Sequence, residues 1–152
     1  MALDQDKRSK IINLCPWTVS FTLPNSMAEV LLEGGKSTTV NNSELVTLAD
    51  NKDVMFYGTG DGDHARIYVD NKDFREYVGF DNLENKKTQY IVTDDECQKL
   101  FELKQQAAFE RNVKEKIIMN HEKHNIMEYA RKTKINDLSK VRFLEEYTGI
   151  KF

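Results

Sequence analysis

The chain has 152 residues, of which 39% are apolar and 31% charged, with a net charge of −3 and a pI near 5.7. This length suffices for one domain with a core, or for a small domain with an appendage, and the charge excludes a general polyanion binder. No apolar run approaches the roughly 20 residues that a membrane span needs, and the polar N-terminus lacks an apolar signal core. Cys15 and Cys97 lie too far apart for a metal motif. We therefore expect buried free thiols and folding in a cytoplasm.

The first quarter of the chain has the pattern of short strands. Residues 1–10 are polar and predict a flexible arm. From Trp17 to Leu23, apolar residues alternate with Ser and Thr, which predicts a strand with prolines at both ends. Residues 28–33 predict a second strand, which Gly34-Gly35 would connect to residues 36–40 as a hairpin.

Two short helices and further strands are expected next. Asn42 or Ser43 can cap a helix that ends near Ala49, and residues 71–79 form a second capped helix ending at Gly79. Residues 53–58, 64–70 and 87–92 have strand composition. The sequence thus predicts a small β-rich module over residues 11–92, sandwich- or barrel-like, with five or six strands.

The glycine-rich stretch GTGDGD, residues 58–63, raises three possibilities. A phosphate loop needs a lysine and a hydroxyl after the last glycine, but Asp63 and His64 stand there. A calcium loop needs a third acid and a closing glutamate, which are missing. Asp-Gly is a hairpin signal, and both flanks are strand-like, so we predict a structural bend between two strands.

The pattern changes to helix at Thr93. The segment TDDE is a capping box, and apolar residues then recur every three or four positions, which predicts one helix over about 94–119. A last helix, capped by Asn136 or Asp137, would end at Gly149. The prediction is an α+β protein with a helical region over residues 93–152.

No catalytic or metal-binding constellation is apparent in the sequence. The segment HEKH at 121–124 lacks the second histidine that a zinc-protease helix needs, and its polarity predicts a solvated helix surface. Asp61 with Asp63, and Asp94 with Asp95, are better explained as a turn and a helix start. We expect a non-enzyme without a cofactor.

Protein or nucleic-acid contacts are the remaining candidates. Aromatic residues are frequent at interfaces, and six apolar side chains are candidate partner-binding residues, although each also fits a core: Trp17, Phe21, Tyr68, Phe101, Phe109 and Val113. A mildly basic stretch with interleaved acids could form a nucleic-acid face containing Arg111, Lys114, Arg131 and Lys132.

Several short motifs occur in the order found in one family. Residues 11–48 have a strand with Asn-Leu, a V-x-F-x-x-P segment, a charged hairpin with a glycine and a short E-L-x-x-L helix; the matching residues are Asn13, Leu14, Val19, Phe21, Pro24, Gly35, Glu44, Leu45 and Leu48. In these features, and in the segments at residues 67–80, 90–102 and 143–152, the chain resembles small virion proteins of tailed bacteriophages of the crAss-like or related large-phage kind. It departs from them at residues 55–65, where the glycine stretch replaces an aromatic-rich loop.

The resemblance implies a structural protein that is made in the cytoplasm of a bacterial host and assembled into the virion. The expected role is an auxiliary or decoration protein that binds the capsid through protein–protein contacts, with self-association possible. One alternative is a head–tail connector or ring component. Another is an intracellular regulator that binds a host protein or nucleic acid.

Overall fold

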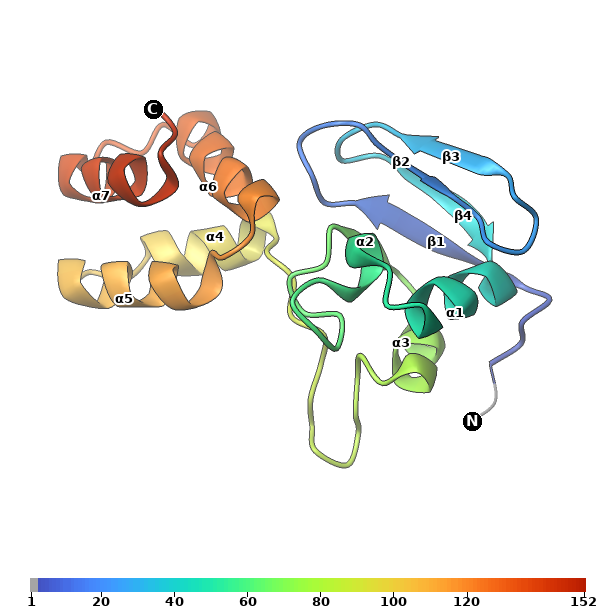
Figure 1. Cartoon of the computed structure of the whole chain (residues 1–152). Coiled ribbons are helices and arrows are strands. Elements are labelled where there is room, and N and C mark those ends of the chain that lie inside the picture. Colours follow the sequence, from blue (N-terminus) through green and yellow to red (C-terminus); the bar gives the residue numbers. More distant parts are fainter. Residues whose placement is uncertain (1–2) are drawn as a thin grey trace. The chain divides into compact units, whose positions relative to one another are not determined.

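The computed structural model describes residues 3–152 and has two compact units, one ending at Ile91 and one beginning at Val92. The strands lie in the first unit, and helices make up most of the second (Figure 1). The α+β class predicted from the sequence is therefore confirmed.

The first unit is built around a three-stranded antiparallel sheet. Its order is β4-β1-β5, with β1 (Arg8–Asn13) in the centre, β4 (Ser37–Asn41) on one side and β5 (Ile67–Val69) on the other. Residues 8–10 were expected in a flexible arm, but they pair with β4. The segment before them is also bonded, since the Lys7 carbonyl accepts the Asn42 N–H at 2.8 Å. Of the predicted arm, residues 1–2 lie outside the described residues.

A second sheet contains only β2 (Val19–Thr22) and β3 (Glu29–Leu32). The Gly34-Gly35 turn does lead from β3 to β4, but the predicted hairpin is wrong, because β3 pairs with β2 and β4 pairs with β1. Gly34 fits where a side chain would not, since a Cβ there would lie 2.6 Å from the Pro16 carbonyl carbon. The strands thus form two small open sheets rather than a closed barrel.

Three helices, rather than the expected two, complete the first unit: α1 (Asn42–Asp50), α2 (Val54–Tyr57) and α3 (Lys72–Val78). Residues 53–58 were predicted as a strand. Instead, the Asp53 side chain accepts the Met55 N–H at 2.9 Å and starts α2. Residues 87–92 are not a strand either, and the segment has a single bridge between Asn82 and Lys87.

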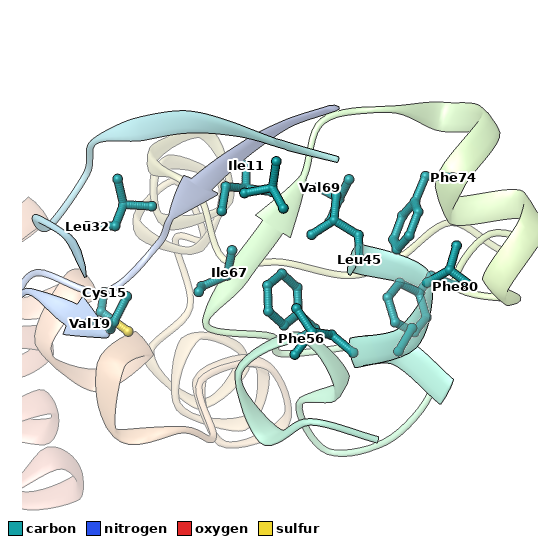
Figure 2. Close-up of a cluster of buried hydrophobic side chains, with 14 residues drawn as sticks. Ile11, Cys15, Val19, Leu32, Leu45, Phe56, Ile67, Val69, Phe74 and Phe80 are labelled. Atoms are coloured by element: carbon teal, nitrogen blue, oxygen red, sulfur yellow. The ribbon is translucent and has the colours of Figure 1, made fainter. Parts of the chain in front are cut away.

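The core of this unit is one apolar cluster that joins the sheet to the helices (Figure 2). Phe56 and Phe74 from helices, and Ile11 and Ile67 from strands, are at most 1% exposed. Each such side chain stabilises the fold by about 1.5–3 kcal/mol relative to an exposed position. The core of this unit therefore draws its largest side chains from both helices and strands.

The glycine stretch connects α2 to β5 and is not a bend between two strands. Gly58 has φ +61°, and a Cβ there would lie 2.1 Å from the Asp63 carbonyl oxygen. A Cβ on Gly62 would lie 2.6 Å from the Phe80 ring. The Asp63 carboxylate accepts the Tyr90 N–H at 2.9 Å. Close packing of the loop on its own backbone at Gly58, and on the Phe80 ring at Gly62, explains these two glycines. Their structural interpretation therefore holds, although the predicted neighbours do not.

The second unit consists of four helices: α4 (Asp94–Phe101), α5 (Gln106–Lys116), α6 (Asn120–Lys132) and α7 (Leu138–Thr148). Both α4 and α7 pack against α5 and against α6. The predicted ends are accurate here, because Thr93 and Asp137 cap α4 and α7, and Gly149 ends α7 with a left-handed φ.

The single helix predicted over 94–119 is wrong, because residues 102–105 separate α4 from α5. At 3.6 residues per turn, Leu100 and Phe109 would lie about half a turn apart on one continuous helix. Both side chains are buried, at 2% and 0% exposure. The break lets each helix direct its own apolar face into the core.

Two buried charged residues stabilise the helix ends of this unit. The Lys140 ammonium donates to the carbonyl oxygen of Phe101, the last residue of α4, at 2.9 Å, and to that of Leu103 just beyond it, at 2.8 Å. The Glu122 carboxylate accepts the N–H groups of Ile118 and Met119, at 3.0 and 2.9 Å, at the start of α6. His121 and Glu122 were expected on a solvated surface. They are instead 2% and 0% exposed. Burial of Glu122 is compensated because its carboxylate satisfies N–H groups at the helix start that would otherwise be unpaired.

Candidate protein-binding groove

A groove of about 640 Å³ lies between β3 and β4 of the first unit. Its walls are residues 28–31 and 38–41, and Arg8, Leu23, Ser26, Ser43 and Glu44 also line it. We call it the β3–β4 groove. It lies where the predicted hairpin ladder would have been, because the two strands are joined by a short turn and yet pair with different neighbours.

The β3 wall presents backbone groups that have no hydrogen-bond partner within residues 3–152. The Leu23 N–H donates to the Ala28 carbonyl at 2.7 Å, and Thr22 is opposite Glu29 in the next pair. Hydrogen-bonded and non-hydrogen-bonded pairs alternate in an antiparallel ladder. The N–H and C=O groups of Glu29 and Leu31 therefore point away from β2, toward the open edge of β3.

The β4 wall is partly covered by an arginine. The Asn42 N–H donates to the Lys7 carbonyl, so the same alternation directs the backbone of Thr39 away from β1. The Arg8 guanidinium donates to the Thr39 carbonyl at 2.6 Å and to its hydroxyl at 3.1 Å. This edge therefore presents a cation, and β3 is the more open edge of the two.

The groove is fixed at the end where α1 begins. The Glu44 carboxylate accepts the N–H groups of Asn25 and Ser26, at 2.9 and 2.8 Å, which anchors the tip of the β2–β3 hairpin to α1. The groove is therefore held open by bonds at its end.

Exposed apolar side chains surround the β3 edge. Leu31 is 75% exposed and Met27 is 73% exposed, in a unit whose other large aliphatic side chains are mostly in the core. Glu29 is exposed on the same strand. An open strand edge with apolar side chains is a surface on which other polypeptides can pair.

The predicted partner-binding residues of the first unit have different environments. Trp17 is 38% exposed. Phe21 packs edge-to-face on Phe56, with ring centroids 5.4 Å apart. Tyr68 lies under the Arg75 guanidinium, 4.9 Å from the ring centroid, and burial raises the pKa of its hydroxyl. Of these three, Trp17 is the most available to a partner.

Phe109 and Val113 are fully buried, at 0% exposure, so their place in the folded unit is the core. Phe101 is half-buried and stacks with Tyr129 at 5.8 Å. A chain of ring contacts connects the four helices through Tyr129, Phe101, Phe109, Phe143 and Tyr147. These rings hold the unit together. Phe101 and Phe109 therefore have the core role that was the alternative to partner binding.

The predicted basic face is divided between two helices. Arg111 and Lys114 lie on α5, and the Lys114 ammonium is 5.8 Å from the Phe143 ring centroid. On α6, Arg131 donates to the Phe152 carbonyl, and Lys132 bonds to Asp94 at 2.7 Å. Bonding to Asp94 also raises the pKa of Lys132. The α6 cations are thus already engaged within the unit.

Leu31, Glu29 and Thr39 were not among the residues predicted to bind a partner. One signal was available, because Leu31 and Leu32 are consecutive on a strand, where alternate residues point to opposite faces. One of the two leucines had to be on the outer face. The open edge itself was not predictable locally, since it depends on β4 pairing with a strand nearly thirty positions earlier.

Comparisons with known proteins give no match: no family model, curated protein or solved structure is similar to this chain. No helix within residues 3–152 is long and apolar enough to cross a membrane. In the same range, no group of three or more His, Cys, Asp or Glu side chains is placed to hold a metal ion.

Proposed function

We propose that this chain is a non-enzymatic structural protein of a bacteriophage virion, which binds the capsid as an auxiliary protein and stabilises it by protein–protein contacts. The observation that carries the proposal is the β2–β3 hairpin, which combines an unpaired edge with the exposed Leu31 and Met27. The order of short motifs over most of the sequence, which resembles small tailed-phage virion proteins, supports the particle as its location.

The mechanism is burial of apolar side chains with a charged rim. Leu31, Met27 and Trp17 offer apolar area to a partner, and Glu29 and Arg8 provide charges that fix its position. A head–tail connector or ring component would use the same surface, but at a different copy number.

The test is mass spectrometry of purified particles, with quantification of copies per particle. Hundreds of copies support a capsid-covering role, and about a dozen support a closed ring at the connector or tail. Absence from the particle would overturn the structural role.

A regulator that binds nucleic acid is the second candidate, since Arg111 and Lys114 are exposed on α5. Binding of this kind weakens steeply as salt rises, because phosphate contacts release counterions. Filter binding of single- and double-stranded DNA over a salt series tests it, and binding that is independent of salt contradicts it.

A further inference from the structure

We propose that the β3–β4 groove binds an extended segment of a partner protein, which adds as a strand to the open edge of β3. The proposal deepens the protein-binding role above and rests on it, but it does not depend on the partner being a capsid protein. Four observations carry it: the direction of the edge groups, the shape of the groove, its charges and its apolar side chains.

The edge groups match an extended backbone. Glu29 and Leu31 direct an N–H and a C=O each toward the open edge, at the spacing of alternate strand residues. An extended polypeptide presents the complementary donors and acceptors at the same spacing, which is how strand addition provides affinity. A globular surface without a strand edge does not offer this pattern.

The groove has the size and the rigidity that such binding needs. Its volume of about 640 Å³ lies within the range of roughly 300–1,000 Å³ typical of ligand-binding clefts. Its walls are held apart by the Glu44 bonds to residues 25 and 26, and Thr38 and Val40 are paired with β1. The edge is therefore already in the binding conformation, and little ordering entropy is lost when a segment binds.

The charges specify the occupant further. Arg8 and Glu29 lie on opposite walls of the groove, and both are exposed. A segment with an acidic side chain on the β4 side and a basic one on the β3 side complements this pair. Apolar side chains at alternate positions would contact Val30 and Leu23 on the inner side of the groove.

A matched pair of proline variants tests the proposal. Leu31→Pro removes the N–H that points into the groove. Ser20 is opposite Leu31 on β2, and Ser20→Pro removes an N–H that points to the other edge of the hairpin. Neither N–H bonds within the β2–β3 ladder, so both variants should keep the fold, as Trp17 fluorescence and circular dichroism would show. The probe is a messenger-RNA-displayed library of random linear peptides, selected on the purified full-length chain.

The expected result is that the wild type and Ser20→Pro select the same peptides, which carry an acidic and a basic residue among alternating apolar positions. Leu31→Pro should bind them about tenfold more weakly or worse, because it loses one hydrogen bond and its ring enters the groove. Equal binding by Leu31→Pro, or no selected peptide, overturns the proposal. A dimer of the wild type that Leu31→Pro dissociates would make a second copy the occupant and would also overturn it.

Amide hydrogen exchange of the wild type gives an answer even if Leu31→Pro does not fold. Bound peptide should slow exchange at Glu29 and Leu31 and leave Ser20 and Thr22 unchanged. Unchanged exchange at Glu29 and Leu31 overturns the groove as the site. Absence of the chain from virions would overturn the particle role alone, whereas its presence there without peptide binding would overturn the groove alone.

Discussion

Each of the two units is held together internally by a different kind of central residue. In the first, the buried Asn13 amide donates to the carbonyl oxygens of Trp17 and Leu32, at 2.8 and 3.0 Å, and accepts the Cys15 N–H at 2.9 Å. It thereby ties the three-stranded sheet to β3 and to the segment that leads into β2. In the second unit, the buried Phe109 ring contacts Phe101 and Phe143, on two other helices. The two small sheets share no ladder and are joined at a buried hydrogen-bonding residue, whereas the helices meet through packed rings and use buried charged groups only at their ends.

Phe109→Ala should have the largest effect. Loss of a fully buried phenylalanine costs about 4 kcal/mol in the free energy of unfolding, which is a large part of the stability of a unit this small. The measurement is urea denaturation followed by helical circular dichroism, with Trp17 fluorescence as a separate signal from the first unit. The helical transition should shift and the Trp17 transition should stay. Leu138→Ala, at a position that is 68% exposed, is the control and should change stability by less than about 0.5 kcal/mol. Equal shifts of both signals would show that the units unfold together.

Asn13→Ala should destabilise the first unit and leave the second unit unchanged. It leaves two carbonyls and one N–H without their side-chain partner, at a cost of about 3 kcal/mol. The Trp17 transition should move to lower urea, while the helical signal from the second unit stays. Asn85→Ala, at an exposed site, is the matched control. A wild-type Trp17 transition in Asn13→Ala would contradict the junction role.

Lys140→Met should have a smaller effect on the second unit. The apolar stem of the side chain is kept, but the carbonyls of Phe101 and Leu103 lose their donor, which costs about 2 kcal/mol. Thermal unfolding by circular dichroism measures this loss. Lys104→Met, at an exposed position of the same region, is the control. If the two variants have the same midpoint, the buried ammonium does not stabilise the end of α4.

The smallest expected difference between the two units is in the reactivity of their buried thiols, Cys15 in the first and Cys97 in the second. Burial raises the pKa of Cys15 to about 11 and that of Cys97 to about 12, from an ordinary value of 9.0. Because the thiolate is the reactive form, iodoacetamide at pH 8 should modify Cys15 faster than Cys97, and both far more slowly than in urea. Peptide mass spectrometry over a time course measures both rates, and faster labelling of Cys97 would contradict the expected order.

The same pKa values give stability a pH dependence. Above pH 9 the unfolded chain loses thiol protons that the folded chain keeps, so the free energy of unfolding decreases. The thiol contribution should be fully present below about pH 9 and should fall as pH rises toward 11 and 12. Urea midpoints at pH 8 and pH 10 measure it, with Cys97→Ala as the control variant.

Helix ends and core residues could be predicted from the sequence because their causes are local. Thr93, Asp137, Gly79 and Gly149 each act within a few positions of themselves, and all four are at the predicted helix ends. Strand pairing was predicted poorly, because Gly34-Gly35 has the composition of a hairpin whichever strands it joins. The predicted turn is present. The possible pairings of the strands on either side of it differ only in which distant strand each one pairs with.

The candidate groove was missed for the same reason. An edge is open only if no distant strand covers it, and neither Glu29 nor Leu31 carries that information. Burial of His121 and Glu122 was missed because polar residues usually lie outside. Here Glu122 is buried with two backbone N–H groups as partners. The exposed Trp17 could not be separated from core aromatics by composition.

The central position of β1 has a consequence for synthesis on the ribosome. Both of its neighbours come later in the chain, and Ile11 is opposite Val69. During synthesis, β1 must therefore wait until about residue 70 has emerged before its second side can be covered. Domains fold as units during synthesis, and pairing between distant segments is slow. Slowing translation downstream of residue 70 should then give this sheet time to close, whereas the helices after Val92 would form quickly once they emerge.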